Sequence, residues 1–378
     1  MKKYLFLGTL GHIAALPATG RRLGPTGTYD LQTLRNNRRD RLSTLPLDEI
    51  NRVVQTELAA HNRRANEMIA AYAMHVDTRD GVDATGQTLT GEMFEVDEYG
   101  RAPTQISGRP SETYFPLRRY QFAAGYTADF FRKKTPADLV AVLENAQAAH
   151  RRELVRQIQH RLFSPFNYEF EDFLTDGKVF SVKAFYNGDG VVPPAGVNLQ
   201  EMKADHNHYM AFSSLTEENL RQVINNTREH SDSGQVEVHI SAVDEGTVRA
   251  FAGFAPATDI QVTVNGGGSV TANRPLDTRN TGNRFIGRFD GVDVHVKPWI
   301  YDHYACAVDM GSPALGIRHP DDREDEGLRM IGQIVTFPLQ SDYWGAEFGI
   351  GVRRRGGATM AQFGAAGGQY TDPTGRIW

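Results

Sequence analysis

Cysteine is almost absent from this chain of 378 residues, in which Cys306 is the only one. An intrachain disulfide is therefore excluded. Cys306 lies in the apolar run Tyr304–Val308, which predicts a small buried hydrophobic residue. Because secreted proteins rich in loops often use disulfides, the scarcity of cysteine favours a reducing compartment.

Long apolar runs are also missing, since no segment approaches the about 18–20 residues that span a bilayer. The opening Met1–Leu16 places two lysines before an apolar stretch, as a signal peptide does. Gly8 and Gly11 interrupt that stretch, and no small-x-small cleavage site follows. Leu16–Gly20 matches a sortase anchoring pentapeptide, a signal that belongs near a C-terminus. We interpret both matches as chance, so a secreted adhesin is not favoured.

Lysine is scarce and arginine is common, and the net charge is −5. The charge is unevenly distributed along the chain. The first 41 residues carry eight basic residues against Asp30 and Asp40, whereas residues 76–114 are mainly acidic. Two such segments on one chain would attract each other between copies, although two unrelated solvated faces explain them equally well. The basic residues are Lys2, Lys3, Arg21, Arg22, Arg35, Arg38, Arg39 and Arg41.

The N-terminal third predicts an arm, a helix and a ribbon. Residues 1–45 lack sustained periodicity, so alone they should form a mobile arm. Apolar spacing over Leu47–Met74 indicates a helix with an interruption. Residues 79–115 are rich in Gly, Thr and Asp, and strands at 87–96 and 104–107 would form a ribbon with too few apolar side chains for its own core.

The strongest local pattern is the helix over 136–163. Thr135 is a candidate N-cap, Pro136 suits the first helical position, and Ser164-Pro165 ends the run. Its length would be about 42 Å. A helix of this length is typical of a spine that runs through an extended subunit.

The remainder alternates between short helices and strands. Ser214–Glu217 predicts a capping box before a helix whose buried side includes Leu220 and Ile224, and Gly234 should close that segment. Strands are expected at 236–240, near 260–264, at 292–296 after a hairpin turn, at 304–309, in one long run from Ile331 to Val352, and at 358–363. A helical turn is expected at 245–251. The chain is therefore predicted to be of the α+β class.

His206 and His208 form the best metal candidate, because side chains two apart on a strand point to the same side. The glutamate and further histidine of a cupin site do not follow, so hydrogen-bonding histidines are favoured over a ligand pair. We therefore expect no metal and no other cofactor.

Other motifs do not predict catalysis. Asn265–Ser269 lacks the lysine of a phosphate-binding loop and is interpreted as a turn. Asp321–Glu326 is a run of charges typical of a solvated loop. Arg353–Gly357 would suit a phosphate or an acidic neighbour, but a turn between strands needs neither role. No Gly-x-Ser-x-Gly elbow is present, and a non-enzyme is expected.

The order of these parts resembles the Hong Kong 97-type capsid proteins of tailed phages and related viruses. The phrase Tyr114–Tyr120 precedes the long helix, Asp205–Met210 and Arg228–His230 follow it, and the chain closes on a long strand leading into Arg353–Phe363. The resemblance implies an N-terminal arm and helix (1–78), an extended loop (79–115), a peripheral domain (116–215 with 330–378) and an axial domain (216–329).

The resemblance also implies a function. Such subunits form pentamers and hexamers of an icosahedral shell around packaged double-stranded DNA, assembled in the cytoplasm of the host bacterium. Separate scaffolding and portal proteins, and in some cases cement proteins, would be partners, and the shell would contact DNA without sequence preference. The arm candidates for assembly or DNA contact are Arg21, Arg22, Arg35, Arg38, Arg39 and Arg41. The loop candidates for contacts between subunits are Glu92, Glu95, Asp97, Glu98, Arg101 and Arg109.

Some relatives link their shells by an isopeptide bond from a lysine of the extended loop. None of the lysines here lies in 79–115, so no such bond is expected. Two alternatives remain: an encapsulin-type protein compartment with the same fold, and a metal-dependent enzyme centred on His206 and His208.

Overall fold

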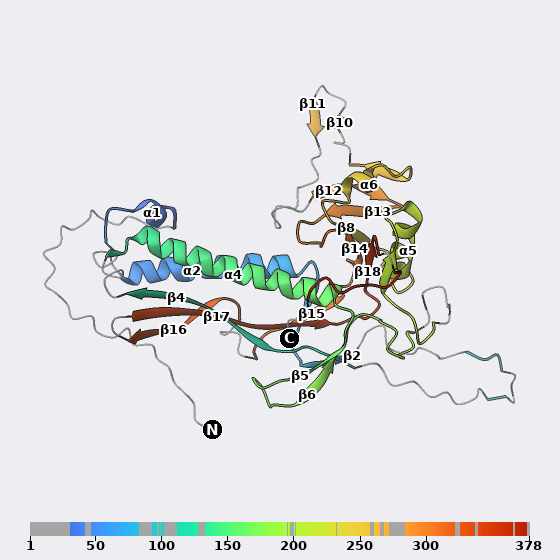
Figure 1. Ribbon diagram of the computed structural model, residues 1–378, viewed down its shortest axis with the longest axis horizontal. Coiled ribbons are helices and arrows are strands. Elements are labelled where there is room, and N and C mark those ends of the chain that lie inside the picture. The colour runs from blue at the N-terminus through green and yellow to red at the C-terminus, as the bar shows by residue number, and fades with distance from the viewer. Residues whose placement is uncertain are drawn as a thin grey trace, which may run out of the picture. The chain divides into compact units, whose positions relative to one another are not determined.

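The fold comes from a computed structural model, whose elements are shown in Figure 1. It describes residues 31–41, 47–82, 93–96, 98, 100–101, 112–127, 133–194, 196, 200, 202–231, 233–257, 261–264, 268–271, 284–321, 326–336, 339–365 and 367–375. These residues form two compact units. The first takes 1–65, 119–152 and 324–347, and the second takes 66–118, 153–323 and 348–378.

The first unit contains α1 (Leu31–Asn36) and the N-terminal parts of α2 (Leu47–Ile69) and α4 (Pro136–Phe163). The predicted bounds of α4 are confirmed. At its start Asp138 accepts hydrogen bonds from the backbone N–H and the hydroxyl of Thr135, at 2.8 and 2.9 Å. The predicted interruption of the helix at 47–74 is wrong, because α2 runs without a break to Ile69.

The prediction of a structureless arm is wrong for residues 31–36. These form α1, whose Leu34 is buried. Burying a leucine side chain contributes about 1.5–3 kcal/mol, which offsets only part of the cost of ordering this short helix. Leu34 packs in a cluster with Ile50, Val53 and Val140, and a second cluster unites Leu58, Leu143, Ala146, Leu328 and Trp344.

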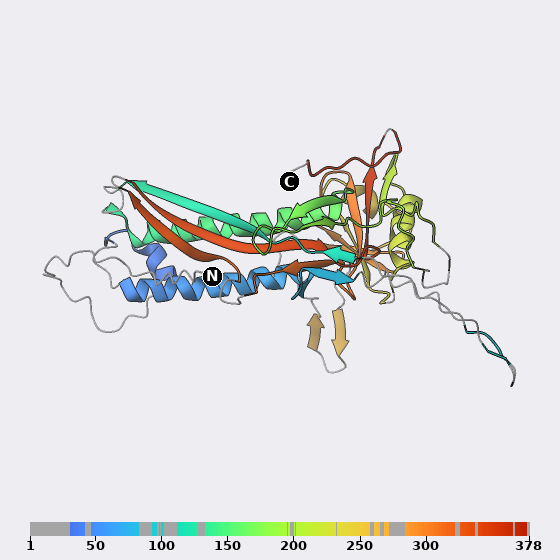
Figure 2. The ribbon, with the colours of Figure 1, turned by 90° about the horizontal axis from the view of Figure 1, so that it is seen from below.

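Helices and strands form two layers in the first unit, with α2 and α4 over the strands (Figures 1 and 2). The strands are β4 (Arg118–Thr127), β16 (Arg329–Thr336) and β17 (Leu339–Val352), and β17 pairs with both others. The predicted single strand from Ile331 to Val352 is therefore wrong. It is an antiparallel pair in which Thr336 faces Leu339, and the intervening Pro338 has no N–H for a strand ladder.

The second unit is built around a seven-stranded sheet in the order β7-β18-β14-β8-β13-β12-β9. Helix α5 (Glu217–Arg228) contacts β14, β18 and β8. The buried residues predicted on the helix, Leu220 and Ile224 among them, are confirmed. The strands are β7 (Tyr209–Phe212), β8 (Val236–Ile240), β9 (Phe254–Pro256), β12 (Arg284–Phe289), β13 (Val292–Val296), β14 (Tyr304–Asp309) and β18 (Ala358–Phe363).

The sheet extends beyond residues 216–329, the limits expected for an axial domain. Its edge strand β7 and the next strand β18 come from the two flanking segments. The expected limits stay a proposal, and these two strands would have to be added to such a domain.

The cap of α5 differs from the predicted capping box. Thr216, and not Ser214, is the N-cap, and its hydroxyl accepts from the backbone N–H of Asn219. Glu217 does not reach back to the cap but accepts from the backbone N–H of Ala252. The short α6 (Glu245–Arg249) follows as predicted.

Smaller pairings complete the second unit. Parallel strands β1 (Ala73–Val76) and β15 (Leu315–Arg318) join the C-terminal end of β17. Antiparallel pairs are formed by β2 (Asp80–Val82) with β3 (Glu112–Tyr114), by β5 (Tyr168–Glu171) with β6 (Val179–Val182), and by β10 (Gln261–Val264) with β11 (Gly268–Thr271).

The described part of the 79–115 segment pairs only at its base, through β2 and β3. Most of the expected ribbon strands lie outside the described residues, and residues 93–96 are not in a strand. Among the helices of the described ranges, none is both long and apolar enough to cross a membrane.

Candidate functional site

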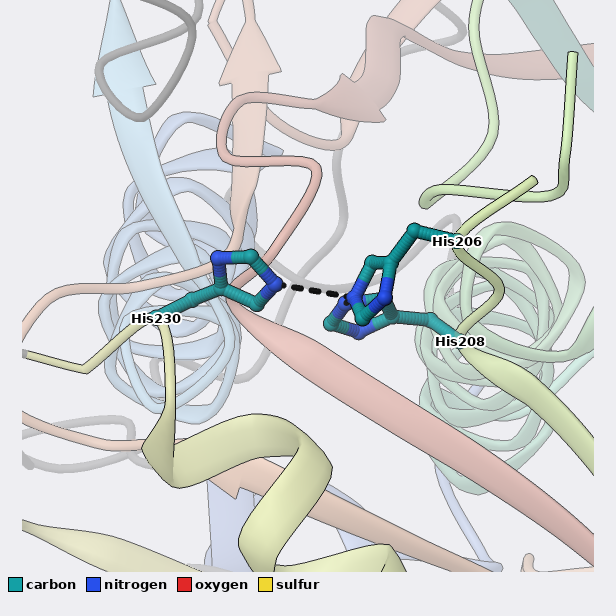
Figure 3. Close-up of side chains that lie close together, drawn as sticks. All are labelled: His206, His208 and His230. Carbon is teal, nitrogen blue, oxygen red and sulfur yellow. Dashed lines mark hydrogen bonds between the residues drawn. The ribbon is translucent and has the colours of Figure 1, made fainter. Parts of the chain in front are cut away.

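Three histidines converge in the second unit (Figure 3). His206 and His208 come from the turn that leads into β7, and their Nε2 atoms are 3.1 Å apart. His230 follows the C-terminal end of α5, and its Nε2 lies 3.0 Å from that of His206. The prediction that His206 and His208 point to the same side is confirmed in effect, although they do not lie in a strand. The contribution of His230 was missed.

Neighbouring backbone fixes the positions of these rings. The His208 backbone N–H donates to the carbonyl of Tyr186 at 2.7 Å, and its Nδ1 lies 2.7 Å from the carbonyl of Ala358. Gly356 lies against the His230 ring, where an added Cβ would be 2.7 Å from Cγ. The Tyr186 ring contacts all three imidazoles, with centroids 5.7–6.1 Å away.

Burial determines the charge state of the cluster. It lowers the pKa of His206, and it lowers the pKa of His230 to about 3. Burial and then the two neighbouring imidazoles hold the pKa of His208 well below its ordinary value. All three rings are therefore neutral near pH 7. Burial also raises the pKa of Glu229, whose Oε1 lies 3.4 Å from Nε2 of His206.

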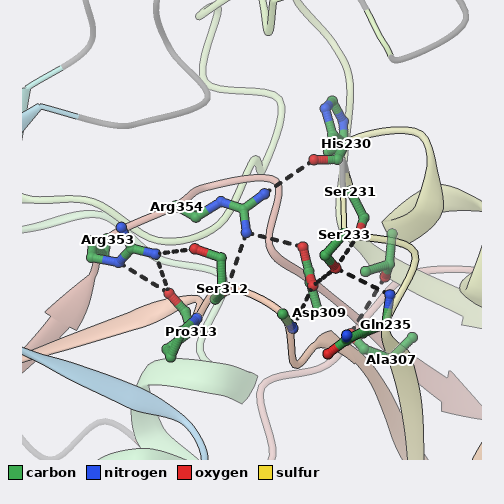
Figure 4. A network of polar contacts seen from close by, with 12 residues as sticks. His230, Ser231, Ser233, Gln235, Ala307, Asp309, Ser312, Pro313, Arg353 and Arg354 are labelled. Carbon is green, nitrogen blue, oxygen red and sulfur yellow. Dashed lines mark hydrogen bonds and ion pairs between the residues drawn. The ribbon is translucent and has the colours of Figure 1, made fainter.

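A polar network lies beside the cluster (Figure 4). Arg354 donates to the Asp309 carboxylate at 3.0 Å and to the carbonyl of His230 at 3.1 Å. Arg353 donates to the carbonyl of Pro313 and to the hydroxyl of Ser312. Through these hydrogen bonds, Arg353 and Arg354 connect the segment after β17 to the end of α5 and to the segment after β14.

Arg355 is fully buried and completes this arrangement. It donates to the carbonyl of Ala184 at 2.8 Å, pairs with Asp189 at 3.0 Å, and lies over the Tyr186 ring. Buried guanidinium groups with internal partners do not reach a phosphate or an acidic neighbour. The interpretation of Arg353–Gly357 as a turn is therefore favoured for the buried Arg354 and Arg355, whereas Arg353 is half-buried.

A second group with metal-ligand chemistry comprises Glu237, Asp293 and His295. Asp293 accepts from Arg288 at 2.6 Å, and Glu237 Oε2 lies 3.4 Å from Nε2 of both His295 and His239. Both carboxylates therefore already face cationic or N–H groups, and ordinary ion pairs and hydrogen bonds explain this group.

Comparison with known proteins identifies the fold. No family model and no curated protein matches the chain. A solved structure of Mycobacterium phage Patience matches with a TM-score of 0.64 and 20% identity, over 94% of this chain and 97% of that one. The chain has a Hong Kong 97-type fold.

Two further solved structures match with lower TM-scores. The capsid of a native GTA particle matches with a TM-score of 0.46 and 13% identity, over 79% of this chain and 90% of that chain. The holo-SrpI encapsulin complex of Synechococcus elongatus matches with a TM-score of 0.42 and 10% identity, over 81% and 89% respectively.

The arm residues of this Hong Kong 97-type chain are only partly described. Arg21 and Arg22 lie outside the described residues. Arg35 pairs with Glu144 on α4, whereas Arg38, Arg39 and Arg41 are exposed. Arg35 thus contacts α4 at the surface of the first unit, and all four of the arginines that the structure describes are exposed.

The extended-loop residues also divide into two sets. Glu92, Asp97 and Arg109 lie outside the described residues. The other three candidates, Glu95, Glu98 and Arg101, are exposed. Their role in subunit contacts stays a prediction.

Proposed function

We propose that this chain is the major capsid protein of a tailed double-stranded DNA phage, which assembles into the pentamers and hexamers of an icosahedral head. The observation that carries the proposal is the Hong Kong 97-type fold, which matches a phage structure over nearly the whole of both chains. Its role would be structural and non-catalytic, and its place would be the virion capsid, assembled in the host bacterial cytoplasm.

The edge strand β16 supports assembly. In the described strands it pairs with β17 alone and lies at one end of the sheet order. Met330, Ile331 and Ile334 on this strand are exposed. An exposed apolar edge promotes pairing with another chain, and closed symmetric assembly would cover it in a defined way.

The extended segment 79–115 offers a second surface. Met93, Phe94 and Val96 are exposed apolar side chains beside the exposed Glu95. Such a run gains burial only against another surface, and we assign that surface to a neighbouring subunit. Obligate interfaces of this kind bury roughly 2,000–5,000 Å².

The basic arm would contact either neighbouring subunits or phosphates of the packaged DNA. Exposed Arg38, Arg39 and Arg41 suit both roles. Scaffolding, portal and cement proteins are proposed as further partners.

The edge strand provides the sharpest test of assembly. Ile331→Asp with Ile334→Asp places two charges on an exposed strand without disturbing a core, so the subunit should fold while shells disappear from electron micrographs. Val243→Asp is the control, because Val243 is as exposed as Ile334 but lies in the loop before α6. Normal shells from the double variant would contradict the assigned surface.

The arm is tested by replacing Arg35, Arg38, Arg39 and Arg41 with alanine. Loss of shells would assign the arm to assembly, whereas intact shells with less nuclease-protected DNA would assign it to packaging. Wild-type particles that contain protein cargo and no DNA would favour the encapsulin alternative instead.

A further inference from the structure

The histidine cluster has a geometry that hydrogen bonding alone does not explain well. The carbonyl of Ala358 only accepts, so the contact at 2.7 Å places the proton of His208 on Nδ1. The Nε2 lone pair of His208 therefore points at His206. If the His206 Nε2 carries a proton, that single N–H must serve both His208 and His230, at 3.1 and 3.0 Å. If it does not, two lone pairs face each other.

A metal ion would use all of these lone pairs at once. Zinc–imidazole bonds of about 2.0–2.1 Å in a tetrahedron place ligand nitrogens about 3.3–3.4 Å apart. The observed separations of 3.0 and 3.1 Å are close to that spacing. One candidate ligand atom from each of the three histidines also lies within 4.8 Å of the other two.

Glu229 offers a carboxylate beside two of the three histidines. Glu229 Oε1 lies 3.4 Å from Nε2 of His206 and 4.0 Å from Nε2 of His230. Bound to a dication, this half-buried carboxylate would supply negative charge to the site. Glu229 and His230 are adjacent in the sequence just after α5, so one short segment would supply two of the ligands.

The groups next to the three histidines are of the kind found around metal-binding histidines. The bond from His208 Nδ1 to a backbone carbonyl is the outer contact that usually fixes the tautomer of a metal-binding histidine. Two cations are near, but Arg354 is paired with Asp309 and Arg355 with Asp189, each at 3.0 Å, so their charge is compensated.

We propose that His206, His208, His230 and Glu229 form a structural site for a divalent transition-metal ion of the zinc class. Four protein ligands leave no open position for a substrate, which distinguishes this site from a catalytic centre. The ion would tie the end of α5 to the turn before β7 and so stabilise the second unit. The metal-dependent enzyme considered from His206 and His208 is thereby replaced by a structural role.

The test uses the full-length protein, loaded with Zn(II) or with Co(II) as a spectroscopic probe and then desalted. We expect one metal ion per chain by elemental analysis, the visible absorption of four-coordinate Co(II), and a higher unfolding temperature with Zn(II). His206→Gln, at the most accessible of the three histidines, should weaken binding by at least about tenfold and abolish the thermal shift.

The control is His61→Gln, a buried histidine of the first unit, which should bind metal as the wild type does. Glu229→Gln should retain weaker binding with an altered Co(II) spectrum. Absence of stoichiometric metal from the wild type, or equal binding by His206→Gln, would overturn the proposal. Neither result depends on shell formation, so this test is separate from that of the capsid function.

Discussion

Arg354 donates a hydrogen bond to Asp309 over 3.0 Å, and both side chains are buried. Burial acts to raise the pKa of Asp309, but hydrogen bonds from Ser233 and Arg354 outweigh it and hold that pKa below its ordinary value. The carboxylate is thus ionised inside the protein and depends on its partners.

Arg354→Ala should therefore be strongly destabilising. It leaves a buried carboxylate without its cation, which typically costs about 3–5 kcal/mol. The control Arg249→Ala removes an exposed pair with Glu245 on α6, which should cost only about 0.3–0.5 kcal/mol. Denaturant unfolding of both unassembled variants measures the difference, and equal effects would contradict the account of this network.

His61 should make stability depend on pH. Its Nε2 lies 3.0 Å from Nδ1 of His150, and burial, followed by the charges of Arg151 and Arg64, lowers its pKa from 6.5 to about 4. Above pH 6.5 both the folded and the unfolded forms are neutral here. Between pH 6.5 and 4 only the unfolded chain gains the proton, so stability should fall by up to about 3 kcal/mol as the pH drops.

The measurement is the free energy of unfolding across that range for the wild type and His61→Gln. The variant should show a shallower decline, while the control His75→Gln, at an exposed position, should follow the wild type. If the free energy of unfolding of His61→Gln falls with pH as steeply as that of the wild type, other groups cause the pH dependence.

Gly349 should not tolerate a side chain. An added Cβ would lie 1.2 Å from the carbonyl oxygen of Pro116. Because that oxygen belongs to the backbone, no side-chain rotation could relieve the clash. Gly349→Ala should cost about 3 kcal/mol or more, the upper end of overpacking effects. Gly332→Ala is the matched control on β16, since its Cβ would meet nothing within 4 Å. Similar unfolding midpoints for the two variants would refute this assignment.

Mature particles should contain no lysine–asparagine crosslinks from the extended loop, because residues 79–115 contain no lysine. After boiling in denaturant, the subunit should migrate as a single band near 42.0 kDa. A ladder of covalent oligomers would contradict this prediction.

Local patterns predicted most of the regular elements. Pro136, Asp138 and the apolar spacing defined α4, and alternation defined β8 and β13. The prediction of one strand from Ile331 to Val352 was wrong because no break was placed at Pro338, which lies between β16 and β17 in the sequence. The helix α1 was missed because its single buried residue, Leu34, depends on packing against distant segments.

The candidate site was less predictable. The spacing of His206 and His208 indicated a shared side, but His230 lies 24 positions from His206 and only the tertiary fold brings it near. The sequence left the arginine run Arg353–Arg355 open to a surface role or a simple turn, since nothing local indicates that its partners, Asp309 and Asp189 among them, are internal.

Electron microscopy of the purified, unmodified chain tests the central claim most directly. We expect uniform closed shells with pentameric and hexameric clusters of subunits. A stable, well-ordered monomer in dilute solution, with β16 and the 79–115 segment covered by its own body, would contradict it.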